Sequence, residues 1–136
     1  MYRGRNARIL IVDDEPELRE LLFDALNDGE MAISLAASGT EAMELAQTEK
    51  PDIVITDLCL GDCSGLEVID RLRDGVGEVP AVIITGHGDA ANLTEASQHR
   101  PVELMTKPLN IDRLRTTISQ ELDRLSKTSE KTQTDT

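Results

Sequence analysis

Acidic side chains follow two short apolar runs in this sequence. Asp13, Asp14 and Glu15 come directly after an Ile-Leu-Ile-Val run, and Asp57 ends the run that begins at Ile53. Such a run is typical of a buried strand, which would deliver the carboxylates at its C-terminal end. Like charges about 4 Å apart repel by roughly 4 kcal/mol at an effective dielectric near 20. The sequence therefore predicts that a cation lies close to these side chains.

Two further polar side chains end expected strands. Thr85 closes the apolar run that begins at Pro80, and Lys107 closes an alternating segment that begins at Val102. Each such residue alone is most often a turn residue, a helix cap or a solvated charge. In a parallel sheet, however, the carboxyl ends of the strands meet at one edge, where ligands bind. The coincidence at four strand ends favours a single site made of Asp13, Asp14, Asp57, Thr85 and Lys107.

This set of side chains suits a hard cation and a phosphoryl group. Three carboxylates with no His or Cys among them favour Mg²⁺, which binds carboxylates, water and phosphoryl oxygens. Lys107 adds a point charge for a carboxylate and a phosphoryl oxygen. An aspartate can itself be the nucleophile that becomes an aspartyl phosphate. Asp57 is the candidate, because it stands apart from the pair Asp13 and Asp14.

The elements that must position these residues alternate between strand and helix. Three of the expected strands are continuous apolar runs, which indicates a parallel sheet covered on both faces. Right-handed βαβ units then give a three-layer α/β/α sandwich. The expected strands are 8–12, 31–37, 53–57, 80–86 and 102–107, and the expected helices begin near 16, 39, 65, 89 and 111.

The totals restrict the class of protein. At 136 residues there is room for one domain, expected at 8–125 between a short N-terminal extension (1–7) and a polar tail (126–136) that should be disordered. The net charge of −12 argues against direct binding of nucleic acid. No apolar run approaches the roughly 20 residues of a membrane span, and the start lacks a signal peptide. We expect a cytoplasmic protein with protein partners and no contact with a membrane.

Cysteine usage adds little to this reading. Cys59 and Cys63 are the two cysteines of the chain, four residues apart around a Gly-Asp turn. Two thiols are too few for a thiolate metal site, and both are expected to be reduced.

Five motifs occur in order within residues 8–125: Val-Asp-Asp-Glu, Ile-Thr-Asp-Leu, Ser-Gly-Leu-Glu, Ile-Thr-Gly-His-Gly-Asp and Thr-Lys-Pro-Leu. Together they resemble the receiver domain of bacterial two-component response regulators, either stand-alone or cut from a larger regulator. The resemblance implies a flavodoxin-like fold, a doubly wound five-stranded parallel sheet with strand order 2-1-3-4-5.

The resemblance also implies roles for individual residues. Asp57 would accept a phosphoryl group from a sensor histidine kinase or a histidine phosphotransfer protein. Thr85 would turn inward to a phosphoryl oxygen, and Lys107 would pair with it. A cis peptide bond would join Lys107 to Pro108.

For the cofactor, the resemblance implies Mg²⁺. Asp14 and Asp57 would ligate the ion directly, together with the backbone carbonyl of Cys59. Asp13 would act through a water molecule.

Three positions depart from the family pattern or could tune the site. Leu104 stands where receivers usually have Phe or Tyr, which puts an aromatic switch in doubt. Gly61 stands where the family commonly has proline. His87, two residues after Thr85, is either an exposed loop residue or a residue that tunes the lifetime of the phosphoryl group.

The function expected is a phosphorylation-dependent switch in a phosphorelay. The chain is not expected to be an enzyme, although it would take part in its own phosphorylation and dephosphorylation. It would change the face formed by 89–98, 102–107 and 110–125 to control a downstream effector protein or domain, and the same face could support a homodimer. The alternative is a phosphate-independent pseudo-receiver that acts as an interaction module. A Mg²⁺ phosphatase would need Asp-x-Asp after the first strand, and a flavin protein would need a phosphate-binding loop there. The sequence has neither pattern at this place, which argues against both classes.

Overall fold

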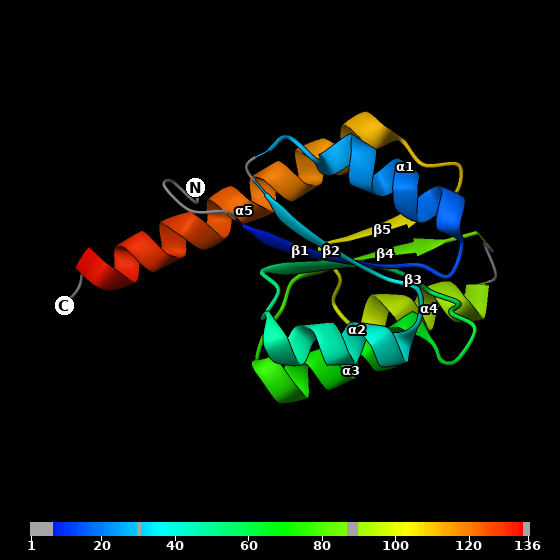
Figure 1. Cartoon of the computed structure of the whole chain (residues 1–136). Coiled ribbons are helices and arrows are strands. Elements are labelled where there is room, and N and C mark those ends of the chain that lie inside the picture. The colour runs from blue at the N-terminus through cyan, green and yellow to red at the C-terminus, as the bar shows by residue number, and fades with distance from the viewer. Residues whose placement is uncertain (1–6, 30, 87–89, 135–136) are drawn as a thin grey trace.

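A computed structural model describes residues 7–29, 31–86 and 90–134 of the chain. Strands and helices alternate, and all strand pairs are parallel, in the order β2-β1-β3-β4-β5 (Figure 1). The predicted fold class and strand order are thereby confirmed. The elements are β1 (Arg8–Val12), α1 (Pro16–Leu26), β2 (Ala32–Ala36), α2 (Gly39–Thr48), β3 (Ile53–Asp57), α3 (Gly65–Val76), β4 (Ala81–Thr85), α4 (Ala90–Gln98), β5 (Glu103–Thr106) and α5 (Ile111–Thr134).

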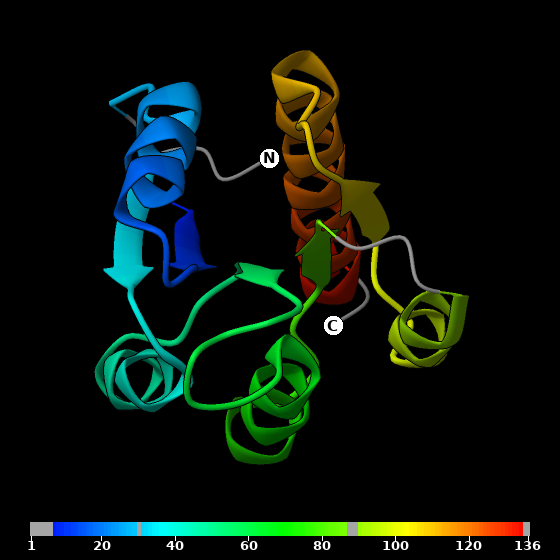
Figure 2. The ribbon, with the colours of Figure 1, turned by 90° about the vertical axis from the view of Figure 1, so that its right-hand side faces the viewer.

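The sheet separates two apolar cores, one on each face. Alternate strand side chains point to opposite faces, so Leu10 and Val54 join the core beneath α2 and α3, whereas Ile9 and Ile55 join the core beneath α1 and α5. Figure 2 shows these helices on the two sides of the sheet. Every residue of β3 and β4 is buried, which explains why both strands read as unbroken apolar runs. The centre of the sheet is therefore a rigid support for whatever lies at its edge.

Polar side chains cap the start of three of the helices in the described part of the chain. Ser38 Oγ accepts a hydrogen bond from the Glu41 N–H at 3.1 Å, and Ser64 Oγ accepts one from the Leu66 N–H at 3.0 Å. Asn110 caps α5 in the same way. These contacts satisfy backbone donors that an α-helix leaves without a partner at its start. They fix where each helix leaves the loop before it.

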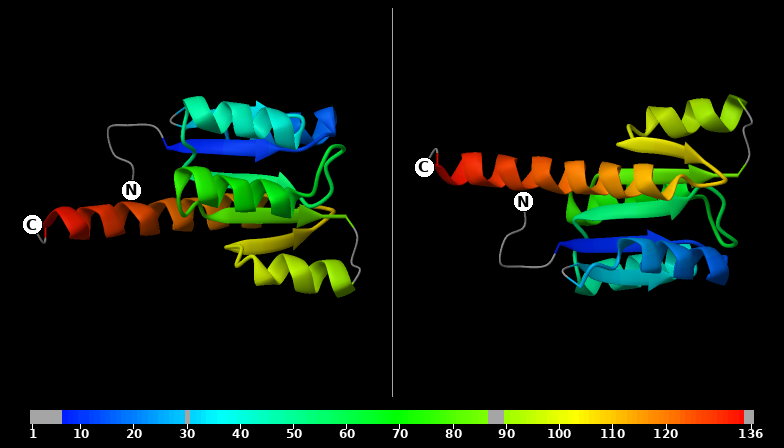
Figure 3. Two further views of the ribbon diagram at one scale, coloured as in Figure 1. Left: turned by 90° about the horizontal axis from the view of Figure 1, so that it is seen from below. Right: turned by 90° about the horizontal axis from the view of Figure 1, so that it is seen from above.

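Helix α5 differs from the prediction at its C-terminal end. Residues 126–136 were expected to be disordered, but α5 continues to Thr134 and projects past the sheet (Figures 1 and 3). The segment after Ser126 contains neither Gly nor Pro, so a helix already formed by packing extends through it at little cost. The domain boundary at 125 stays a prediction.

In the part of the chain that the structure describes, none of the helices has both the length and the apolar character needed to cross a membrane.

Candidate functional site

The strand register brings the predicted site residues to one edge of the sheet. Asp57 is the last residue of β3 and Thr85 is the last residue of β4, while Asp13 and Lys107 directly follow β1 and β5. Because β1, β3, β4 and β5 are neighbours in the sheet, these four residues lie side by side at its carboxyl edge. The structure therefore assembles the set that the sequence analysis singled out.

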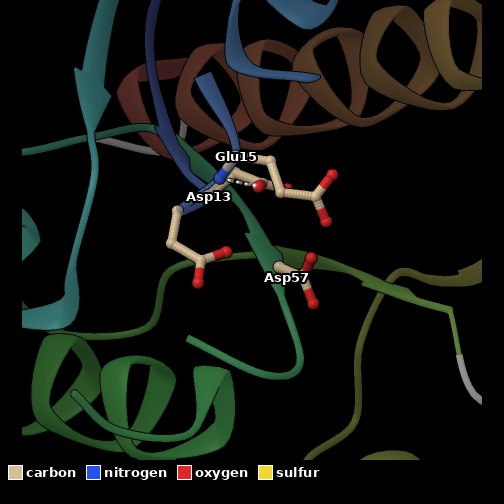
Figure 4. Close-up of side chains that lie close together, drawn as sticks. Asp13, Glu15 and Asp57 are labelled. Carbon is tan, nitrogen blue, oxygen red and sulfur yellow. Dashed lines mark hydrogen bonds between the residues drawn. The ribbon is translucent and has the colours of Figure 1, made fainter. Parts of the chain in front are cut away.

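Four carboxylates form a tight group at this edge. Asp13, Asp14, Glu15 and Asp57 each place one oxygen so that all four atoms lie within 4.8 Å of one another. Asp13 and Asp57 are buried, whereas Asp14 and Glu15 are exposed. Figure 4 shows the carboxylates of Asp13 and Asp57 beside each other, with the Glu15 N–H donating to Asp13 Oδ1 at 2.8 Å. This arrangement concentrates negative charge in one place.

The ionised form of Asp13 is destabilised by its surroundings in the folded protein. Its Oδ2 atom is buried and has no hydrogen-bond partner among the described residues. Burial raises the pKa of Asp13 to about 6; the hydrogen bond from Glu15 opposes this shift and the negative charge of Asp57 adds to it. A buried carboxylate oxygen without a donor costs free energy that a bound cation or its water would offset. Within the described part of the chain, this oxygen therefore lacks the donor or cation that would offset its burial.

Lys107 is the cation that the sequence analysis required. Its Nζ donates to Asp57 Oδ2 at 2.9 Å and to Glu15 Oε1 at 3.2 Å. Burial alone would lower the pKa of Lys107, but the hydrogen bonds and charges of Asp57 and Glu15 together outweigh it and leave the pKa raised. One ammonium stands against four carboxylates, so the group keeps an excess of negative charge. A divalent cation fits that excess.

The loop after β3, residues 58–64 and called here the β3–α3 loop, closes over Asp57. The Cys59 N–H donates to Asp57 Oδ1 at 3.0 Å, so both oxygens of this carboxylate have a donor. A bridge between Cys59 and Ser64 and a hydrogen bond from Gly65 N to Leu58 O at 2.8 Å close the base of the loop. Both cysteines are free, and the Cys59 side chain is exposed. The loop therefore holds the backbone of Cys59 against the candidate nucleophile.

Thr85 and Lys107 are linked through the backbone. Thr85 is buried, and its carbonyl accepts a hydrogen bond from the Lys107 N–H at 2.9 Å. The peptide bond between Lys107 and Pro108 is cis, as the resemblance implied. Leu104 is half-buried and packs against the core beneath α2 and α3. His87 lies outside the described residues, so its suggested role stays a prediction.

Sequence reasoning missed three contacts around the site. Glu15 shares Lys107 with Asp57, and Arg19 donates to the backbone carbonyl of Asp13 at 2.7 Å. Asp62, which the sequence analysis placed in a Gly-Asp turn, instead contacts the start of α2. The Glu15 contact spans 92 positions and the Asp62 contact spans 23, so no local pattern could reveal either.

Comparison with known proteins agrees with this geometry. The chain matches the response regulator receiver domain over residues 9–119. It is 29% identical over 117 residues to the regulatory protein LuxO of Vibrio cholerae, which covers 86% of this chain and 26% of that protein. It is 28% identical over 117 residues to sporulation initiation phosphotransferase F of Bacillus subtilis, which covers 86% of this chain and 94% of that protein.

The solved structures agree as well. A response regulator receiver domain protein from Clostridium thermocellum superposes with a TM-score of 0.79 at 26% identity, over 88% of this chain and 97% of that one. The chain thus spans about a quarter of the length of LuxO and nearly all of the Bacillus protein.

Proposed function

The chain belongs to the response regulator receiver domain family, and from this premise we propose that it is a phosphoacceptor in a two-component phosphorelay. Asp57 takes the phosphoryl group in a Mg²⁺-dependent reaction. The observation that carries the proposal is the setting of Asp57: a buried carboxylate with Lys107 on one oxygen, the Cys59 N–H on the other, and two further aspartates beside it.

The chemical step transfers a phosphoryl group from a histidine nitrogen to a carboxylate oxygen of Asp57. An oxygen of Asp57 forms a bond to phosphorus while the phosphorus–nitrogen bond of a phosphohistidine breaks, and the electron pair of that bond stays on the imidazole nitrogen. Such transfers ask the protein mainly for position and positive charge. Lys107 supplies a charge that moves from the carboxylate to a phosphoryl oxygen, and the hydroxyl of Thr85 donates to another.

The oxygen donors at the sheet edge fit Mg²⁺. Asp14 and Asp57 would hold the ion directly with the backbone carbonyl of Cys59, and Asp13 would bind it through water. The unpartnered Oδ2 of Asp13 supports this assignment, because that atom needs a donor. When bound, the ion neutralises the carboxylates and draws charge from the transferring phosphoryl oxygens.

The partners follow from the reaction. The donor is a sensor histidine kinase or a histidine phosphotransfer protein, and the output is a downstream effector protein or domain. We propose that phosphorylation alters the face formed by α4, β5 and α5, which could also pair two copies of the chain. Leu104 lies on β5 within this face and packs toward the core, so it would transmit a movement of Thr85 without an aromatic ring. Catalysis is limited to the protein's own phosphorylation and dephosphorylation, and the proposed compartment is the cytoplasm.

Intact mass measurement tests the proposal. The parent and an Asp57→Asn variant are incubated with Mg²⁺ and acetyl phosphate, with Asp52→Asn as a control because Asp52 binds the Arg8 N–H far from the site. We expect one added phosphoryl group on the parent and on Asp52→Asn, and none on Asp57→Asn. If no protein gains mass and calorimetry detects no Mg²⁺ binding, the phosphate-independent interaction module replaces the proposal.

A further inference from the structure

The β3–α3 loop lies against two aspartates of the proposed site. At its start, the Cys59 N–H holds Asp57. At its tip, Gly61 faces Asp14, since a Cβ built on Gly61 would lie 3.8 Å from Asp14 Oδ2. Glycine at the tip of an exposed loop gives the backbone wide conformational freedom. The bridge and hydrogen bond at the base of the loop hold its start at Cys59, and a further contact beside Gly61 would fix its tip.

Asp62 makes that contact with the first turn of α2. Its Oδ1 accepts a hydrogen bond from the Gly39 N–H at 2.9 Å. Its Oδ2 accepts from the Thr40 N–H and from the Thr40 hydroxyl, both at 3.0 Å. Ser38 already serves the next donor, the N–H of Glu41. One carboxylate from a distant loop thus completes the start of this helix.

The electrostatics of Asp62 suit a permanent contact. The hydrogen bonds from Gly39 N and Thr40 N lower the pKa of Asp62 to about 2, so its carboxylate is ionised at neutral pH. Negative charge at a helix N-terminus is favourable because the first backbone N–H groups carry partial positive charge. Protonation does not release the loop near pH 7.

Close packing accompanies the hydrogen bonds. A Cβ added to Gly39 would lie 2.2 Å from Cys63 Sγ and 3.5 Å from Asp62 Oδ1. Only glycine leaves space for the loop to rest directly on the helix start. The loop and α2 are therefore fitted to each other on both sides of the contact.

We propose that Asp62 is a positioning residue for the Mg²⁺ site: by binding the first turn of α2 it fixes the β3–α3 loop so that Cys59 and Gly61 stay against Asp57 and Asp14. This inference rests on the proposed function. Asp62 touches neither the ion nor the phosphoryl group. It acts through the loop, as outer contacts orient the ligands of other metal sites.

The test compares Mg²⁺ affinity in three variants by isothermal titration calorimetry. Asp62→Ala removes all three contacts, and Asp62→Asn keeps the side-chain volume with one acceptor oxygen. Ser38→Ala removes the other cap of α2 and leaves the loop in place, so it controls for fraying of the helix. We expect about tenfold weaker binding for Asp62→Ala, a smaller loss for Asp62→Asn, and a change of less than about twofold for Ser38→Ala.

A second measurement separates positioning from a general loss of structure. The rate of labelling by acetyl phosphate should fall in Asp62→Ala at low Mg²⁺ and return to the parent rate at about tenfold higher Mg²⁺. Equal Mg²⁺ affinity in the parent and Asp62→Ala, or equal losses in Asp62→Ala and Ser38→Ala, would overturn the inference alone. A rate that extra Mg²⁺ does not restore would also overturn it. A parent that binds no Mg²⁺ would overturn the proposed function, and the inference with it.

Discussion

Two aspartates, Asp13 directly after β1 and Asp62 within the β3–α3 loop, have opposite environments. Asp13 lies in the acidic group, where burial raises its pKa to about 6 and one oxygen has no partner among the described residues. Asp62 lies at the start of α2, where backbone N–H groups lower its pKa to about 2 and both oxygens accept hydrogen bonds. An aspartate oxygen thus lacks a hydrogen-bond donor among the described residues at one position, and at the other position both oxygens accept hydrogen bonds.

The difference separates stability from function. A carboxylate that holds one segment against another receives donors for each oxygen, as Asp62 does at the start of α2. At the sheet edge, Asp13 Oδ2 has no donor among the described residues and four carboxylates lie close together, which costs stability unless a cation binds. Such local conflict is expected at functional sites, where the rest of the fold supplies the stability that the site gives up. The contrast therefore supports the roles proposed for Asp13 at the Mg²⁺ site and for Asp62 in positioning the loop beside it.

The largest expected effect concerns Gly65, which packs against the backbone of Asp57 at the end of β3. A Cβ on Gly65 would lie 2.2 Å from the backbone carbonyl oxygen of Asp57, so Gly65→Ala must displace the strand end that carries the nucleophile. We expect the free energy of unfolding to fall by about 3 kcal/mol. Gly75 has open space around its Cβ position within α3, and Gly75→Ala should raise it by about 0.5–1 kcal/mol. Urea titration measures the free energy of unfolding of both variants. Equal values would show that the end of β3 can move to accommodate a methyl group at Gly65.

The second prediction is that an Asp→Asn substitution stabilises the protein at position 13 and destabilises it at position 62. In buffer without Mg²⁺ at pH 7.5, Asp13→Asn should raise the free energy of unfolding by about 1–2 kcal/mol, because it removes a charge that burial disfavours. Asp62→Asn should lower the melting temperature, because it takes a charge and an acceptor from the start of α2.

Thermal melts with and without Mg²⁺ check this pair of variants. Saturating Mg²⁺ should raise the melting temperature of the parent and remove the advantage of Asp13→Asn, because the bound ion stabilises only the folded state. The interpretation fails if Asp13→Asn is the less stable protein without Mg²⁺.

Much of the fold and most of the site could be predicted from the sequence because local signals determined them. Unbroken apolar runs identified β1, β3 and β4, and alternation with helices implied a parallel sheet whose carboxyl edge collects the strand-end residues. The need for a cation near the carboxylates led to Lys107, and the structure places its Nζ at 2.9 Å from Asp57. These inferences needed periodicity and charge, both of which the sequence displays.

The remainder depended on contacts between distant segments. Asp62 looked like a turn residue because its partners, Gly39 and Thr40, precede it by 23 and 22 positions respectively. The tail after Ser126 looked disordered because it is polar, yet α5 continues to Thr134. Polarity reports that a segment lacks a core of its own, but a helix packed upstream already has its nucleus.

The third prediction concerns pH. The pKa of Asp13 is raised from 3.8 to about 6 in the folded protein, so between these values the folded state binds more protons than the unfolded state. The contribution of Asp13 to stability therefore increases as the pH falls from about 7 to about 5, by about 1 kcal/mol. Urea titrations without Mg²⁺ measure this slope, and subtracting those of Asp13→Asn isolates the residue. A difference that does not change with pH would show that Asp13 titrates normally.

The smallest effect concerns the exposed member of the acidic group. Glu15 lies 3.2 Å from Lys107 Nζ, but more than half of its side chain is exposed, and Lys107 keeps the closer contact with Asp57 when Glu15 is neutralised. Exposed pairs contribute about 0.2–1 kcal/mol, so Glu15→Gln should change the free energy of unfolding by less than about 0.5 kcal/mol. A double-mutant cycle with Lys107→Met measures the coupling directly. A coupling above about 1 kcal/mol would exceed the range for exposed pairs. It would mean that the ion pair between Glu15 and Lys107 contributes to stability although Glu15 is exposed.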